Sequence, residues 1–270
     1  MYSNIHKHIV CSIIACFFIL SEAAFAEPIR QENPTVGDLY RAFETVVFGS
    51  EFGTKKTRKN ILKWNQPLRV SVQAYGDRVI EGANQIKEFV FEQIPVTDLQ
   101  FDVVQKHLSR LTEITNLPTE DYKSLGSKPN ITIKFVPQFQ MANPVLAPVE
   151  QKILRRWASE NGCYFILTSK KNVIDHAIII VNSERSPAAI DHCVLEELTQ
   201  ILGLPNDNKV AWASVFSSRH KVTALSDYDQ ILLKTLYDPK IPSGMARKEA
   251  MRQAFKIITH LHNRLPSTLK

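Results

Sequence analysis

The stretch that decides the fold runs from Glu196 to Asp207 and reads EELTQILGLPND. Its first half predicts the end of a helix, because Ser186 fits the N-cap, Pro187 fits the first helical position and apolar residues recur at helical spacing. Gly203 is a natural stop for this helix. An amphipathic helix with a polar outer face would show the same pattern, so the argument depends on the residues that follow Gly203.

The spacing of the polar residues in this stretch is that of a zinc-protease helix. Such a helix needs His-Glu-x-x-His, in which two histidines reach one metal and the glutamate activates the bound water. A longer form adds a turn glycine and a third histidine three residues later. Here Glu197 holds the general-base position and Gly203 the turn. Oxygen-bearing side chains replace all three histidines, and a carboxylate follows: Glu196, Gln200, Asn206 and Asp207.

These residues resemble the active-site region of the metzincin zinc proteases. In matrix-protease-like metzincins, a turn with methionine and a helix of the type D-x-x-x-I-x-x-L-Y come next. Phe216 stands at the methionine position here, and a helix from Asp229 to Tyr237 follows, with Asp229 closer to the apolar positions than in the family pattern. The resemblance implies an α+β fold with a zincin/metzincin-like mixed sheet, a central helix of the active-site type and C-terminal helices.

A closer resemblance is to DUF2927, a family of exported bacterial proteins of unknown function. The family pattern is Cys-x-x-Glu-Glu-x-x-Gln-x-x-Gly-Leu-x-Asn-Asp, then LT/LS-x-x-D, Leu-Tyr-Asp-Pro and Gly-Met. This chain begins the pattern at Cys193 and continues it at Leu225–Asp229, Leu236–Pro239 and Gly244-Met245. The match identifies a family and implies no activity.

Hydrophobic periodicity also favours an α+β domain. Helical and strand patterns do not alternate strictly, which argues against a βαβ fold. The strands are expected at 68–72, 130–136, 163–167 and 176–181. The predicted segments are a signal peptide (1–26), a leader and N-terminal helix (27–60), a degenerate metzincin-like domain (61–245) and a C-terminal helix and tail (246–270).

The N-terminus predicts export. Lys7 precedes an apolar run from Ile9 to Leu20, and the segment ends at Ala26 in an A-x-A cleavage signal. The run is shorter than the roughly 20 residues of a membrane span, and no later segment is apolar enough for one. We favour a periplasmic or extracellular protein without a lipid anchor. Lipoprotein anchoring at Cys16 is the alternative.

The cysteines indicate a candidate disulfide, and the charge pattern limits the binding partners that we expect. Cys163 and Cys193 remain after the predicted cleavage, and an oxidising compartment favours a disulfide between them; two buried thiols are the alternative. The net charge is +6, and its densest basic run, Lys55–Lys59, is interpreted as a solvated loop. No nucleic-acid-binding module is recognisable, so nucleic acid is not an expected partner.

The loss of the histidines predicts a polar site without zinc catalysis. Zinc prefers imidazole and thiolate ligands, and amides are poor ones, so no cofactor or metal is expected. We predict an exported, non-catalytic envelope protein that binds a peptide, a protein or an envelope component in the former substrate cleft. The predicted cleft residues are Glu196, Gln200, Asn206 and Asp207.

Three alternatives stay open. The protein could be a hydrolase with a non-standard metal or none, in which Glu197 is the general base. His192 lies four residues before Glu196 on the same helical face, so the two could form a metal pair, and His220 lies in the loop after the helix. In the third interpretation the protein is purely structural, and the polar residues only cap helices and form hydrogen bonds in the core.

Overall fold

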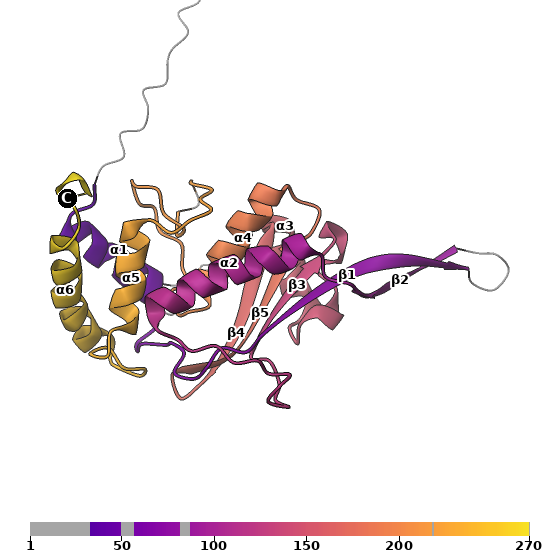
Figure 1. The fold of residues 1–270 in the computed structure, drawn as a ribbon, viewed down its shortest axis with the longest axis horizontal. Helices are drawn as coiled ribbons and strands as arrows, with labels where there is room; N and C mark the ends of the chain where they lie inside the picture. The colour runs from indigo at the N-terminus through magenta and orange to yellow at the C-terminus, as the bar shows by residue number, and fades with distance from the viewer. Residues whose placement is uncertain (1–32, 50–56, 82–86, 218, 270) are drawn as a thin grey trace, which may run out of the picture. The chain divides into compact units, whose positions relative to one another are not determined.

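The structure is a computed structural model that describes residues 33–49, 57–81, 87–217 and 219–269 (Figure 1). The predicted signal peptide and the alternative lipid site at Cys16 lie outside the described residues, as do Lys55 and Lys56 of the basic run. None of the helices in the described part of the chain has the length and hydrophobicity that a membrane crossing needs.

A mixed five-stranded sheet lies at the centre of the described residues, which confirms the predicted α+β class. The order of its strands is β2-β1-β3-β5-β4. Strand β3 pairs in parallel with both β1 and β5, whereas β2 and β4 pair antiparallel at the two edges. The strand bounds are Val70–Glu81 (β1), Lys87–Ile94 (β2), Ile131–Val136 (β3), Cys163–Lys170 (β4) and Val173–Asn182 (β5).

Helices cover both faces of this sheet. Helices α2 and α4 pack together and α4 contacts β4 and β5, while α3 contacts β4. Helices α1, α5 and α6 pack against one another, and α5 also contacts α2. The helix bounds are Val36–Phe48 (α1), Asp98–Thr115 (α2), Gln151–Glu160 (α3), Pro187–Gln200 (α4), Asp227–Tyr237 (α5) and Arg247–Asn263 (α6).

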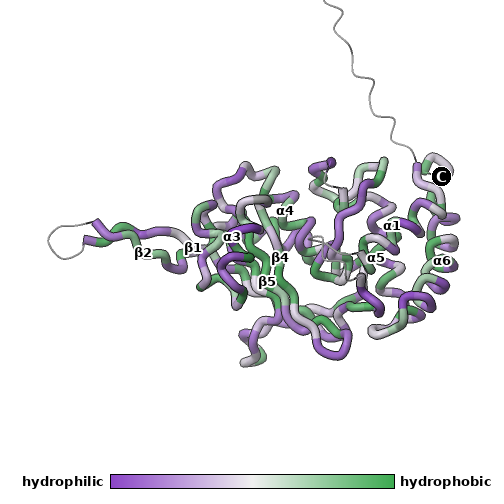
Figure 2. Tube along the Cα trace, turned by 180° about the vertical axis from the view of Figure 1, so that it is seen from behind, coloured by the Kyte–Doolittle hydropathy of each residue, from purple (hydrophilic) through white to green (hydrophobic). Residues whose placement is uncertain are grey.

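The strands alternate between two hydrophobic cores, as the two-residue period of a strand requires. Ile133 of β3 and Ile179 of β5 belong to the larger core with α2 and α4. Tyr164 of β4 and Ile180 of β5 point to a smaller core that includes Leu154 of α3. Burial on both faces explains why β4 and β5 are strongly hydrophobic stretches in Figure 2.

Helix α4 begins and ends where its sequence predicts. Ser186 accepts a hydrogen bond from the backbone N–H of Ala189, and Pro187 occupies the first turn. After the helix, Gly203 has a φ of +110°, and a Cβ built there would lie 2.3 Å from the carbonyl oxygen of Leu62. Only glycine allows this turn, which sets the directions of Asn206 and Asp207.

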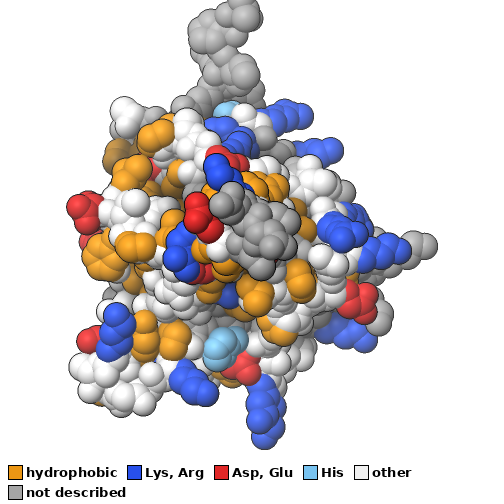
Figure 3. Space-filling model, turned by 90° about the vertical axis from the view of Figure 1, so that its right-hand side faces the viewer, with side chains coloured by type: hydrophobic (Ala, Val, Ile, Leu, Met, Phe, Trp, Pro, Cys, Tyr) orange, Lys and Arg blue, Asp and Glu red, His pale blue; other side chains and the backbone are white. Residues whose placement is uncertain are grey.

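Strand β2 and the second half of β1 were not predicted. From Ala74 onward β1 pairs with β2, and beyond Ala74 it has no pairing with β3, so this part is a two-stranded hairpin. Val79 is 49% exposed and its partner Phe89 is 73% exposed, so no buried face imposes a hydrophobic pattern. Figure 3 looks at this side of the structure and shows hydrophobic side chains scattered among lysines and arginines.

Candidate functional site

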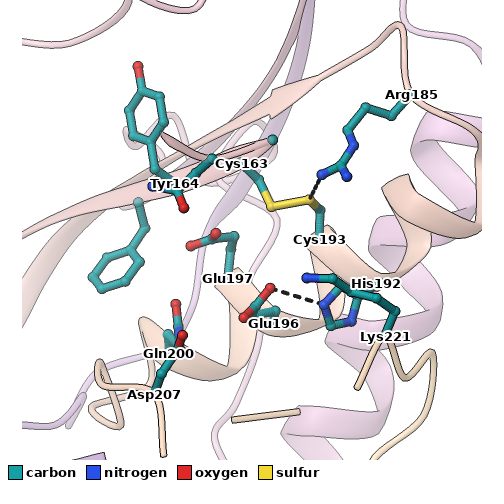
Figure 4. A pocket seen from close by; sticks show the side chains of 13 residues that line it. Cys163, Tyr164, Arg185, His192, Cys193, Glu196, Glu197, Gln200, Asp207 and Lys221 are labelled. Carbon is teal, nitrogen blue, oxygen red and sulfur yellow. Dashed lines mark hydrogen bonds and ion pairs between the residues drawn. A yellow bond between two sulfur atoms is a disulfide. The ribbon is translucent and has the colours of Figure 1, made fainter. Parts of the chain in front are cut away.

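A pocket lies between helix α4 and the edge strand β4 (Figure 4). Its volume is about 150 Å³. One wall comes from β4 and the other from α4, and a disulfide between Cys163 and Cys193 joins the two walls with a Cα–Cα distance of 5.9 Å. The predicted disulfide is therefore confirmed, and it fixes the width of the pocket.

Most of the residues predicted for the site gather in this pocket. Three of them project from α4, and the fourth follows the turn at Gly203. Glu197 is only 5% exposed, so its carboxylate lies deep between the two walls. The predicted residues that line the pocket are Glu196, Glu197, Gln200 and Asp207.

Asn206 does not line the pocket, which differs from the predicted grouping. Its side-chain amide is buried and donates a hydrogen bond of 3.1 Å to the backbone oxygen of Val46, near the end of α1. The physical reason is the turn at Gly203, after which Asn206 faces α1 and the next residue, Asp207, faces the pocket. This hydrogen bond links α1 to the turn that follows α4.

Asp207 has an altered acidity. Protein atoms around it reduce its hydration, and together with the nearby charge of Glu196 they raise the pKa of Asp207 to about 6. Lys221, His192 and a 2.9 Å hydrogen bond from the Gln200 amide act in the opposite direction. The residue as a whole keeps contact with solvent, so it can exchange a proton without opening of the fold.

His192 is buried beside Glu196. Its Nδ1 lies 2.7 Å from the carbonyl oxygen of Val222, and because a carbonyl only accepts, this nitrogen carries a proton. Its Nε2 lies 3.2 Å from Glu196 Oε2, and the two side chains form an ion pair when both ring nitrogens of His192 carry a proton. The two side chains therefore lie together, as their spacing on one helical face predicts, and a metal pair stays a prediction. His220 does not line the pocket and instead contacts Ser217.

Sequence reasoning missed the basic residues that line the pocket. Arg185 packs over Gly162 so closely that a Cβ at Gly162 would lie 1.8 Å from its guanidinium, and it donates a hydrogen bond to Cys193 Sγ at 3.7 Å. Lys221 comes from the loop between α4 and α5. The glycine beside Cys163 was the only local signal for Arg185, and none indicated Lys221.

The pocket residues do not fit the histidine-bound zinc of the proteases that the sequence resembles. Cys163 Sγ and one carboxylate oxygen each of Glu196 and Glu197 lie within 4.8 Å of one another. The sulfur belongs to a disulfide, however, and zinc binds the thiolate. The amide nitrogen of Gln200 is engaged with Asp207. We therefore derive no catalytic step through zinc.

Comparison with known proteins identifies the family. A family model described as "Protein of unknown function (DUF2927)" matches residues 37–255, which is most of the chain, so this chain belongs to that family. No curated protein and no solved structure matches the chain. The metzincin resemblance therefore stays a prediction from the residues of the Glu196–Asp207 stretch and the segments after it.

Proposed function

We propose that this chain is an exported, non-catalytic binding protein for extended peptide segments. The peptide lies against β4, and one of its cationic side chains binds in the adjacent pocket. The observation that carries the proposal is the position of three carboxylates, Glu196, Glu197 and Asp207, beside an edge strand. Export rests on the N-terminal sequence, and the absence of catalysis rests on the replaced histidines.

Strand β4 offers a backbone for a peptide. Among the described residues its only neighbour in the sheet is β5, so its other edge has no strand partner. An extended peptide can add to such an edge, where main-chain hydrogen bonds supply affinity and a pocket for one side chain supplies specificity. Cys163, Tyr164 and Phe165 belong both to β4 and to the pocket lining, so a peptide on this edge would pass the pocket.

The size and charge of the pocket limit what it accepts. The volume of the pocket is about 150 Å³. Pockets for drug-sized ligands and cofactors occupy about 300–1,000 Å³, so one side chain is the better fit. The lining has three carboxylates and two cationic side chains, so the carboxylates are in excess. Because Glu197 is also buried, the pocket favours a lysine, an arginine or a terminal amine.

Peptide binding tests this proposal. We expect extended decapeptides with one central lysine or arginine to bind the purified oxidised protein more tightly than the same peptides with norleucine. The double variant Glu196→Gln/Glu197→Gln should lower the affinity at least about tenfold, because it removes two acceptor charges. Glu113→Gln on the exposed face of α2 is the matched control. Equal affinity for lysine and norleucine peptides would contradict the proposal.

One observation favours a second candidate, a hydrolase in which Glu197 is the general base. The pKa of Asp207, which lines the same pocket as Glu197, is raised to about 6, and acid–base enzymes use carboxylates whose pKa is raised in this way. A screen of peptide and cell-wall substrates with the wild type and with Glu197→Gln decides this. Turnover that Glu197→Gln abolishes would establish the hydrolase; turnover that survives the substitution would exclude Glu197 as its base.

A further inference from the structure

We propose that the pocket becomes a zinc site when the Cys163–Cys193 disulfide is reduced, so that the same two sulfur atoms serve either as a cross-link or as metal ligands. The inference concerns the reduced protein and does not depend on peptide binding, which the oxidised protein would perform. It starts from the three ligand atoms already close together, on Cys163, Glu196 and Glu197.

The ligand set is suited to zinc once the sulfurs are free. Zinc takes four ligands in a tetrahedron, with thiolate sulfur at about 2.3 Å and carboxylate oxygen at about 2.1 Å, which places ligands roughly 3.4–3.8 Å apart. The three atoms now lie within 4.8 Å of one another, so side-chain rotation of about 1 Å closes the set. Cys193 supplies the fourth ligand once reduction lets its sulfur, now bonded to that of Cys163, move to the roughly 3.8 Å that separates two sulfur ligands of zinc.

Neighbouring residues support this site from outside the ligand set. His192 Nε2 is buried and lies 3.2 Å from Glu196 Oε2. It can therefore orient the Glu196 carboxylate toward a metal, as residues behind metal ligands commonly do. Arg185 lies 3.7 Å from Cys193 Sγ, and its positive charge stabilises the thiolate that reduction releases there.

The redox step requires a dithiol as reductant. One of its thiolates attacks Cys163 Sγ, the sulfur–sulfur bond breaks and Cys193 leaves as a thiolate. The second thiol of the reductant attacks the mixed disulfide, frees Cys163 and closes a disulfide within the reductant. Two electrons thus pass from the dithiol to the protein. Zinc then replaces the protons on the two cysteine sulfurs, and these protons go to solvent.

The exposed fractions of the two cysteines favour attack of the reductant at Cys163 over attack at Cys193. Cys163 is 7% exposed and Cys193 is 1% exposed, and both line the pocket. A small dithiol therefore reaches Cys163 through the pocket mouth, and Arg185 is placed beside the sulfur that leaves. The carboxylates Glu196 and Glu197 already face the same space (Figure 4).

Cobalt(II) is the probe for this site, because its bonds to thiolate sulfur absorb strongly in the near ultraviolet. The purified protein is reduced with a dithiol, freed of it under nitrogen and titrated with Co²⁺. We expect one Co²⁺ per chain with sulfur-to-metal absorption, displacement by Zn²⁺, and none of this in the oxidised protein. Glu196→Gln/Glu197→Gln keeps both thiols and should bind at least about tenfold more weakly, whereas Glu113→Gln should match the wild type.

Several outcomes would overturn the inference. They are no binding by the reduced protein, equal binding by the oxidised protein, and unchanged affinity in Glu196→Gln/Glu197→Gln, which would mean that two thiols alone capture the metal. If reduction removes the far-ultraviolet circular dichroism signal, recovery on addition of Co²⁺ supports the site and continued unfolding refutes it. Peptide binding by the oxidised, metal-free protein is measured separately, so failure of either proposal is distinguishable.

Discussion

The buried carboxylate of Asp229 and the carboxylates of the pocket differ in the number of hydrogen bonds that they accept from described residues. Asp229 at the start of α5 is fully buried and accepts hydrogen bonds from Ser214 Oγ at 2.6 Å, Val215 N at 3.2 Å and Ser226 N at 3.0 Å. In the pocket, Asp207 accepts one hydrogen bond from a described residue, that from Gln200, and shares its space with Glu196. Asp229 stabilises the fold, whereas Asp207 leaves acceptor capacity for a ligand.

The largest expected effect follows from removing the buried carboxylate. Asp229→Ala leaves three donors without their acceptor, and each unsatisfied buried group costs about 1–3 kcal/mol. We expect the free energy of unfolding to fall by at least about 3 kcal/mol, measured by urea denaturation. Asp229→Asn keeps one oxygen acceptor and should lose less. A loss below about 1 kcal/mol in Asp229→Ala would remove the distinction between Asp229 and the pocket carboxylates.

The second-largest loss of stability is expected from a substitution at Gly203, in the turn that follows α4. Gly203→Ala places a Cβ 2.3 Å from the Leu62 carbonyl oxygen at a φ of +110°, so we expect a loss of about 1–3 kcal/mol in unfolding free energy. Gly37→Ala is the matched control, because a Cβ there lies 3.5 Å or more from its neighbours. Equal stability of the two variants would show that the backbone at Gly203 relaxes.

Substitutions in the pocket should have small effects on stability. Glu196→Gln removes one of two neighbouring negative charges, so we expect the unfolding free energy to stay within about 0.5 kcal/mol of the wild type or to rise. Urea denaturation measures this beside the peptide-binding assay. A large loss of stability without a loss of binding would favour the purely structural interpretation of the site.

The smallest effect concerns the protonation of Asp207. Because the folded pKa of about 6 lies above the ordinary value of 3.8, the folded state binds this proton more tightly than the unfolded state does. Its contribution to stability is complete below pH 4 and is lost as the pH rises through 6. Carboxyl NMR titration should show a pKa for Asp207 that falls in Glu196→Gln. An unchanged pKa would show that Glu196 does not contribute.

The capping of α5 illustrates what the sequence could predict. The spacing of Ser226 and Asp229 predicts a capping box, and the structure confirms it. Capping rules concern residues close together in the sequence, so they do not predict the other two donors to Asp229. These donors are Ser214 and Val215, which approach Asp229 through the folding of the intervening loop. The same limit explains Lys221, which enters the pocket from a loop without a pattern of its own.

The predicted fold class and several predicted elements agree with the structure where local chemistry imposes a period or a turn. The α+β class, the helix from Pro187 and the disulfide followed from periodicity, capping and compartment. The hairpin strand β2 was missed because its side chains are largely exposed and impose no alternation. Asn206 was grouped with the pocket because spacing along a helix was extended past Gly203, where the chain leaves the helix and its direction changes.

The position of the disulfide has a consequence for the order of folding. Strands β4 and β5 and helix α4 follow one another directly along the chain, and the bond between Cys163 and Cys193 closes a sequence separation of only 30 residues. Contacts of short sequence separation form quickly because little chain entropy is lost in closing them. We therefore expect the segment that contains the pocket to fold early and to offer α2, which packs against α4, a preformed surface on which to assemble.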